Sequence, residues 1–212
     1  MKFTDLLNLV ADEPLFDTAL LLAGDVRRQD VQRELTRWER NGRLFQVRRG
    51  LYTLAPPYQH VTPHPFLTAN RMVKGSYVSC QSALAWYGLI PEYTPVTVSV
   101  TTLRPGTWNT ALGRFIFRHV KPDLLWGYVA LDVTPGQQAF VARPEKALLD
   151  LIHLTPGADQ QNYLDELRLQ NLERLEPQRL VEYARRAKRP KLERAVDLLL
   201  TMLDTQPDYE AL

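Results

Sequence analysis

The sequence contains a single cysteine, Cys80, among its 212 residues. One thiol cannot close a disulfide within the chain or build a cysteine-rich zinc site, which excludes a disulfide-stabilised secreted scaffold. The chain also lacks an uncharged apolar run of the roughly 20 residues that a membrane span needs. Its first 14 residues carry three acids, unlike a secretory signal. We therefore expect a cytoplasmic protein with no membrane partner.

Glycine-rich phosphate loops are missing as well. The ten glycines never occur as Gly-x-Gly, and no Gly-Lys-Ser or Gly-Lys-Thr is present. This excludes the fingerprints of dinucleotide-binding enzymes, of kinases and of P-loop proteins.

Two of the four histidines, His60 and His64, are separated by Pro63, which argues against a pair of metal ligands on one helical face. Cys80 adjoins an apolar run and is expected to be a packed thiol. We expect no cofactor, no metal and no enzymatic activity.

What is present is an ordinary folded composition, with 45% hydrophobic and 24% charged residues. A chain of this length allows two small domains, and fifteen prolines favour many short elements over one long bundle. The double proline at 56–57 and the proline- and histidine-bearing stretch after it predict a boundary. We expect a first domain over residues 1–57, a linker over 58–65 and a second domain over 66–212.

The first domain has a recognisable order of elements. Apolar residues at helical spacing predict three short helices, over residues 3–10, 15–23 and 27–41. In the third helix the apolar stripe is Val31, Leu35 and Trp38. Two extended runs then surround Arg48-Arg49-Gly50 and predict a hairpin. Three helices followed by a hairpin are the plan of a winged helix-turn-helix domain.

Charge within this domain is strongly segregated, although the whole chain has a net charge of only +2. Residues 1–25 hold one base and five acids, a net charge of −4, whereas residues 26–50 hold eight arginines and three acids, a net charge of +5. The excess falls on the third helix and the hairpin, the DNA-facing elements of a winged helix.

Arginine and glutamine are the residue types that read guanine and adenine edges in the major groove. The candidate DNA-binding residues of the third helix and its start are Arg27, Arg28, Gln29, Gln32, Arg33, Thr36, Arg37 and Arg40. Those at and near the hairpin, expected to meet phosphates or the minor groove, are Arg43, Arg48 and Arg49. The alternative is a solvated helix face on which Arg37 and Arg40 pair with Glu34 and Glu39.

A second basic cluster lies near Pro190 and consists of Arg185, Arg186, Lys188, Arg189, Lys191 and Arg194. It either extends a DNA footprint, receives an acidic partner, or merely gathers cations at a helix end. The last interpretation is the simplest.

The second domain is predicted to mix helices and strands. Helices are expected over 66–73, 81–87, 163–169, 177–187 and 192–203 and from Pro144 onwards, and strands over 77–79, 95–102, 114–119, 127–133 and 137–142. In residues 95–102 valines alternate with Thr97, Ser99 and Thr101, which predicts a half-buried strand. Trp108, in a Gly-Thr-Trp-Asn loop, is the tryptophan expected to be exposed.

Several motifs occur together in a recognisable order. They are Leu35-Thr-Arg-Trp38, Asn41-Gly-Arg-Leu44, Arg48-Arg-Gly-Leu-Tyr-Thr-Leu54, Tyr77-Val-Ser-Cys-Gln-Ser-Ala-Leu84 and Arg143-Pro-Glu-Lys-Ala-Leu-Leu-Asp150. In this order they resemble AbiEi-family antitoxins over most of residues 15–155. The resemblance implies an α+β protein: an N-terminal winged helix-turn-helix domain, then a mixed α/β antitoxin domain ending in helices.

The resemblance also implies a function. Members of that family repress their own operon and counteract a nucleotidyltransferase-like toxin encoded beside them. We therefore expect two partners, double-stranded operator DNA and such a toxin, and include a homodimer on DNA among the expected assemblies. One alternative is a protein-interaction module that binds a toxin enzyme directly, with the winged helix as scaffold. A weaker alternative is a metal-dependent nuclease that uses Asp123, Asp132 and Glu145.

Overall fold

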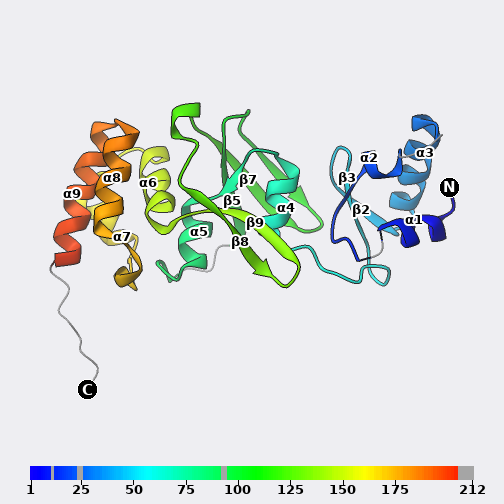
Figure 1. Ribbon diagram of the computed structural model, residues 1–212, viewed down its shortest axis with the longest axis horizontal. Helices are drawn as coiled ribbons and strands as arrows, with labels where there is room; N and C mark the ends of the chain where they lie inside the picture. The colour runs from blue at the N-terminus through cyan, green and yellow to red at the C-terminus, as the bar shows by residue number, and fades with distance from the viewer. Residues whose placement is uncertain (11, 23–25, 92–94, 205–212) are drawn as a thin grey trace, which may run out of the picture.

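The computed structural model describes residues 1–10, 12–22, 26–91 and 95–204, and over them the chain is a mixed α and β protein. The molecule is elongated, with a small N-terminal unit at one end and a pair of C-terminal helices at the other (Figure 1). A larger sheet with its helices lies between these ends. The expected α+β class is confirmed.

The N-terminal unit joins three helices to a small sheet. Its elements are α1 (Phe3–Val10), β1 (Phe16–Asp17), α2 (Thr18–Leu21), α3 (Arg28–Arg40), β2 (Leu44–Arg48) and β3 (Leu51–Leu54). The strands are antiparallel in the order β1-β3-β2. One apolar cluster holds them, in which Leu6 of α1, Trp38 of α3 and Tyr52 of β3 are at most 1% exposed.

The second helix is shorter than predicted. Apolar spacing predicts a helix over residues 15–23, but Phe16 and Asp17 form strand β1 and only Thr18–Leu21 are helical. Ala23 lies outside the described residues. Phe16 pairs with Tyr52 of β3, and their rings stack with centroids 5.9 Å apart. A long-range strand pairing thus overrides the local helical spacing.

The hairpin β2–β3 is irregular at one point. Gln46 pairs with Tyr52 and Arg48 with Leu51, so Val47 is an extra residue that forms a bulge. A bulge bends the strand and redirects the side chains that follow. Gly50 closes the turn with φ +81°, a left-handed conformation that suits glycine.

No helix or strand lies between β3 and α4 (Pro65–Met72), a stretch that the structure describes in full. This connector is nevertheless held at its end. The buried Gln137 donates from Nε2 to the Thr62 carbonyl at 2.9 Å and accepts from the His64 backbone N–H at 2.8 Å. The Gln137 side chain of the second unit therefore holds the end of the connector through the backbone groups of Thr62 and His64.

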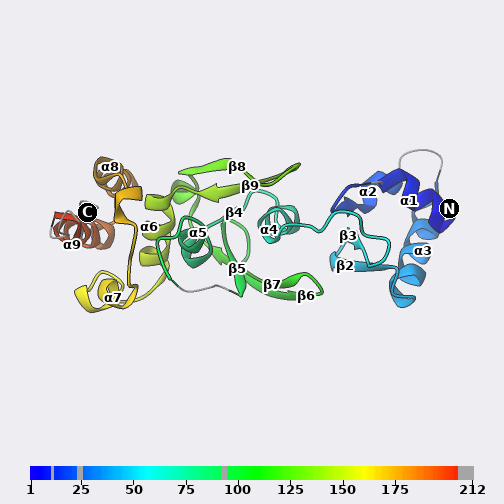
Figure 2. The same cartoon turned by 90° about the horizontal axis from the view of Figure 1, so that it is seen from below.

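The second unit, α4 to α9, is built on a sheet of six strands in the order β6-β7-β5-β4-β9-β8. They are β4 (Tyr77–Val78), β5 (Val96–Thr101), β6 (Gly106–Thr110), β7 (Gly113–His119), β8 (Tyr128–Thr134) and β9 (Gln137–Ala142). The β4–β9 and β5–β7 pairs are parallel and the others antiparallel. Helix α4 covers the face toward the N-terminal unit, and α5 (Cys80–Trp86) and α6 (Pro144–Leu154) cover the other (Figure 2).

Two sequence expectations in this sheet are corrected. Strand β5 is not half-buried, because Thr97, Ser99 and Thr101 on its polar face are 8%, 0% and 0% exposed. It is an inner strand with helices over both faces of the sheet, so the alternation of valine and polar residues does not mark a solvent side. Trp108 lies on strand β6, not in a loop, and is half-buried with its ring 5.1 Å from that of Phe117.

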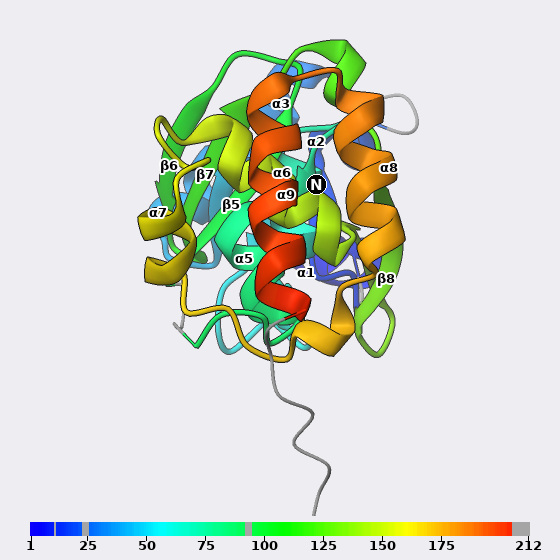
Figure 3. The ribbon, with the colours of Figure 1, turned by 90° about the vertical axis from the view of Figure 1, so that its left-hand side faces the viewer.

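The C-terminal segment is helical, as predicted. Helices α7 (Gln161–Glu166), α8 (Pro177–Ala187) and α9 (Pro190–Asp204) follow α6, with a short 3₁₀ turn at Leu172–Arg174. Another 3₁₀ turn, Pro122–Leu124, lies between β7 and β8. Helices α8 and α9 lie side by side and pack on α6 (Figure 3). Among the described residues, no helix combines the length and hydrophobicity needed to cross a membrane.

Candidate nucleic-acid interface

Helix α3 buries one side and presents the other to solvent. Val31, Leu35 and Trp38 recur at helical spacing and are at most 1% exposed. The polar residues of the other side line one shallow hollow of about 540 Å³: Gln29, Gln32, Arg33, Thr36, Arg37, Arg40 and Asn41. Six of the predicted DNA-binding residues are thus brought together on one helix face.

Two arginines of this face pair with acids one helical turn earlier. Arg33 lies 3.6 Å from Asp30, and both side chains are more than half exposed. Arg37 pairs with Glu34, so the solvated-face interpretation is confirmed for this one pair. Within the described residues Arg40 has no ion pair. Exposed pairs of this kind are worth at most about 1 kcal/mol, so they exchange readily for another anion.

A second hollow lies between α3 and the hairpin. It measures about 950 Å³ and is lined by Thr18, Arg28, Gln29, Gln32, Gln46, Arg49, Gly50 and Tyr52. Arg28, at the first turn of α3, and Arg49, at the hairpin turn, are exposed and have no ion pair in the part of the chain described. Gln46 and Tyr52 also line this hollow, and Gln46 donates from Nε2 to the Tyr52 hydroxyl at 2.9 Å. The fold therefore brings two distant arginines to one polar hollow.

Three further predicted residues lie outside these hollows. Arg27 precedes α3 as its N-cap residue. The Arg43 guanidinium lies 4.9 Å from the centre of the Phe3 ring, in the geometry of a cation–π contact. Arg48 turns toward the second unit, where it donates to the Met72 carbonyl and lies 5.2 Å from the Trp108 ring centre. Its guanidinium is engaged there and is not free for a phosphate.

The second basic cluster lies on α8 and α9, at the opposite end of the molecule from α3 (Figure 1). Arg189 pairs with Asp123 at 2.8 Å and Arg194 with Asp159 at 2.6 Å, while Lys191 donates to a backbone carbonyl. These cations therefore brace the C-terminal helices and do not extend the surface of α3.

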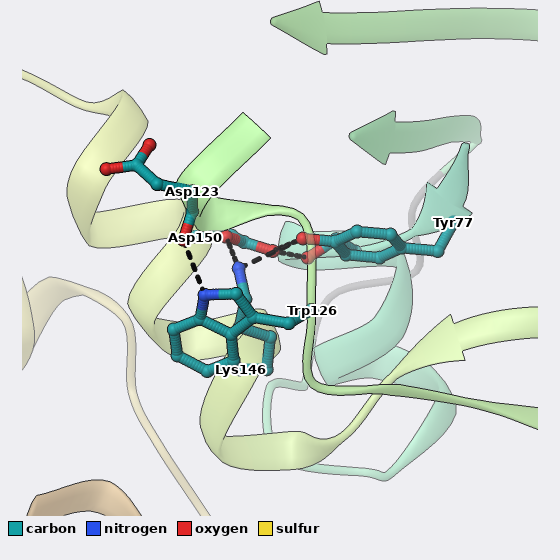
Figure 4. A network of polar contacts seen from close by, with 6 residues as sticks. Tyr77, Asp123, Trp126, Lys146 and Asp150 are labelled. Atoms are coloured by element: carbon teal, nitrogen blue, oxygen red, sulfur yellow. Dashed lines mark hydrogen bonds and ion pairs between the residues drawn. The ribbon is translucent and has the colours of Figure 1, made fainter. Parts of the chain in front are cut away.

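The second unit contains a buried polar network that joins β4 to α6 (Figure 4). Lys146 pairs with Asp150 one turn later and also donates to the Tyr77 hydroxyl at 2.9 Å. Asp150 Oδ2 accepts from Tyr77 at 2.9 Å and from Ser79 at 2.7 Å. Burial, and next the Asp150 carboxylate, raise the pKa of Tyr77, so its hydroxyl stays protonated and donates. The three members Tyr77, Lys146 and Asp150 are at most 2% exposed.

An aromatic side chain closes this network from outside. The Trp126 ring centre lies 5.0 Å from Lys146 Nζ and 4.4 Å from the Arg186 guanidinium, and its indole N–H donates to the Asp123 carbonyl at 2.8 Å. The network and the ring that covers it join α6 to strand β4 of the sheet. Sequence-based prediction identifies only the helix start here, although opposite charges four residues apart in an apolar helix are a signal for such a pair.

The acids considered for a nuclease have separate partners. Asp123 pairs with Arg189, and Asp132 accepts from a side chain of β9 at 2.9 Å. Glu145 is fully buried and accepts from the backbone N–H at the start of α8 at 2.9 Å. In the ranges that the structure describes, no group of three or more His, Cys, Asp and Glu side chains is placed to hold a metal ion.

Cys80 is buried, as expected for a packed thiol. Burial, and next the Asp150 carboxylate, raise its pKa to about 12. We expect the folded protein to resist alkylation by iodoacetamide at about pH 8, because only the thiolate is a nucleophile. Mass spectrometry after treatment with and without urea measures this, and full modification is expected only in urea. Rapid modification without urea would show that the thiol is not packed.

No protein-family model matches the chain, and no curated protein matches it in sequence. Among solved structures, the crystal structure of the RV2827C protein from Mycobacterium tuberculosis aligns over 96% of this chain and 81% of that chain, with 17% sequence identity and a TM-score of 0.49. This level of similarity carries no inference about function.

Proposed function

We propose that this protein is a DNA-binding transcriptional repressor whose N-terminal unit is a winged helix-turn-helix domain. The observation that carries the proposal is the exposed face of α3, where glutamine and arginine side chains line one hollow and adjoin a second that contains Arg28 and Arg49. Both residue types suit base edges and phosphates. Residues 26–50, which include this face and the hairpin turn, have a net charge of +5 on a nearly neutral chain.

The order of elements supports the winged helix assignment. A short strand precedes α2, α3 follows, and the hairpin pairs with that strand in the order β1-β3-β2. Helix α3 has 13 residues and is therefore roughly 20 Å long. An α-helix with its side chains is about 10–12 Å across, which suits the major groove, about 12 Å wide.

In this arrangement the two hollows have different roles. The face that carries Gln32, Arg33 and Arg37 meets base edges, since long polar side chains there point away from the apolar core. Arg28 and Arg49 take phosphates on either side of the groove, because they adjoin one hollow and have no competing ion pair among the described residues. A symmetric operator would require a homodimer.

The second half of the proposal is an antitoxin role for the second unit, with a nucleotidyltransferase-like toxin as partner. It rests on the resemblance to AbiEi-family antitoxins, and no catalytic role is assigned to this chain. Direct capture of the toxin is the second candidate. It is favoured by two exposed aromatic side chains of the β8–β9 hairpin, Tyr128 and Phe140, at 38% and 49% exposure with ring centres 5.8 Å apart. Large exposed aromatics are frequent at protein interfaces.

Fluorescence anisotropy tests the DNA-binding proposal. A labelled duplex from just upstream of the gene is compared with a scrambled duplex of the same composition at two salt concentrations. We expect a preference of roughly 10³-fold or more for the upstream duplex and an affinity that falls steeply with salt. Equal affinity for both duplexes would reject a specific repressor and favour the protein-interaction candidate. Copurification with the product of the neighbouring gene then tests that candidate.

A further inference from the structure

We propose that Trp108 and Arg71, two residues of the second unit, are positioning residues for the DNA interface because they hold the tip of the β2–β3 hairpin that carries Arg49. This proposal rests on the proposed function and concerns what sets the relative positions of α3 and the hairpin turn. It concerns residues far from α3 in the sequence, none of which belongs to the residues predicted to bind DNA.

The hairpin is divided between two apolar cores. Leu44, Tyr52 and Leu54, on one face, belong to the cluster of the N-terminal unit. Val47 and Leu51, on the other face, belong to the large cluster of the second unit and are 4% and 3% exposed. One face of the hairpin is therefore placed by α3 and its neighbours, whereas the other, up to the turn, is placed by the second unit.

Arg48 reinforces this division with polar contacts. Its guanidinium donates to the carbonyl of Met72, at the end of α4, and lies 5.2 Å from the ring centre of Trp108 on β6. Trp108 is in turn held edge-on by Phe117 at 5.1 Å. A guanidinium that is stacked and hydrogen-bonded in this way holds its own strand in one orientation. The next residue along the chain is Arg49.

A second contact fixes the strand that pairs with the hairpin. Arg71 Nη2 of α4 lies 2.9 Å from Asp17 Oδ2, and Asp17 pairs with Leu51 in the small sheet. Thr18 then bonds through its backbone N–H to the Gly50 carbonyl at 2.8 Å. Thr18 and Gly50 both line the hollow that contains Arg28 and Arg49. The contact between Arg71 and Asp17 is thus linked, through two backbone pairings, to residues that line the hollow containing Arg28 and Arg49.

These contacts have one consequence for DNA binding. Arg28 belongs to α3 and Arg49 to the hairpin tip, so the separation of the two phosphate contacts depends on how the second unit holds the tip. Loosening the tip leaves the number of cationic contacts unchanged but makes their spacing variable. The affinity for operator then falls because the tip must be ordered on binding, while the salt dependence is preserved.

The test measures operator affinity and its salt slope in the full chain for Trp108→Ala and Arg71→Met. We expect each to weaken binding by roughly 2- to 30-fold, the range of coupling through residues that touch no ligand. The salt slope should stay that of the wild type, whereas loss of one phosphate contact would reduce it by about 0.9. Trp108→Phe keeps an aromatic face for Arg48 and should restore most of the affinity.

Trp86→Ala is the matched control, since Trp86 is a half-exposed tryptophan of the second unit that packs on His64 and Phe66 instead of the hairpin. We expect it to bind operator like the wild type. Saturating titrations give the active fraction of each variant, which separates a change in affinity from partial unfolding. Hydrogen exchange without DNA should show faster exchange of the hairpin-tip amides in Trp108→Ala than in Trp86→Ala.

The outcomes are distinguishable. If the wild type prefers its operator and both Trp108→Ala and Arg71→Met bind it equally well, the positioning role is overturned while the proposed function stands. A salt slope reduced by about 0.9 in Arg71→Met would also overturn it for Arg71, because that residue would then be a phosphate contact. If the wild type shows no operator preference, the proposed function fails and the positioning role fails with it.

Discussion

We expect Asp150→Ala to lower the free energy of unfolding by about 3 to 5 kcal/mol, which is a large share of the stability of a typical domain. The substitution leaves the Lys146 ammonium buried at 2% exposure without its carboxylate. It also removes the acceptor of the Tyr77 and Ser79 hydroxyls. Urea unfolding followed by far-ultraviolet circular dichroism measures the loss.

Two further variants make this prediction specific. Lys146→Met combined with Asp150→Leu should be less destabilising than Asp150→Ala alone, because no unpaired charge is left in the core. Lys74→Met, at an exposed lysine before Gly75, is the control and should change stability by less than about 0.5 kcal/mol. A small loss for Asp150→Ala, close to that of the control, would show that the network does not hold α6 on the sheet.

We expect Arg33→Ala and Arg37→Ala each to weaken operator binding by about 1 to 3 kcal/mol and to relax the preference at one base pair. The side chains are 77% and 59% exposed, and their partners Asp30 and Glu34 belong to the same helix. Releasing such exposed pairs costs at most about 1 kcal/mol, less than a bidentate contact to a guanine edge provides. Anisotropy with duplexes that differ at single base pairs measures both effects.

Arg49, which we propose contacts a phosphate, should behave differently. Arg49→Ala is expected to weaken binding to all duplexes evenly and to reduce the salt slope by about 1. Arg185→Ala removes an exposed arginine from α8, at the far end of the molecule, and should leave operator binding unchanged. The docking of α3 in the major groove would be rejected if Arg33→Ala and Arg37→Ala bound like Arg185→Ala.

Helices with a regular apolar stripe could be predicted from the sequence alone. Helices α1 and α8 have the predicted bounds, α3 is one residue shorter at each end, and α6 begins at Pro144 as predicted. Their periodicity is a local property, because residues three and four apart share a helix face wherever the helix packs. Strand β6 was missed for the opposite reason. Its sequence, Gly-Thr-Trp-Asn-Thr, has one large apolar residue, and it is a strand because it pairs with β7.

The candidate site divides in the same way. The face of α3 with Gln32, Arg33 and Arg37 follows from helical spacing, and the structure keeps these residues together. Arg48 and Arg49 are adjacent in the sequence and indistinguishable there. The bulge at Val47 and the presence of Met72 and Trp108 direct Arg48 to the second unit, whereas Arg49 remains at the polar hollow.

The sequence by itself determined the segregation of charge toward residues 26–50, the apolar stripes of the main helices and the absence of glycine-rich phosphate loops. Each of these depends only on which residues stand near one another along the chain. The tertiary structure alone decided that Lys146, Asp150 and Tyr77 form one buried network, that strand β5 is covered on both faces, and that one face of the β2–β3 hairpin packs in the core of the second unit. These features join residues far apart in the sequence, and burial and strand pairing between such segments have no local pattern from which to be predicted.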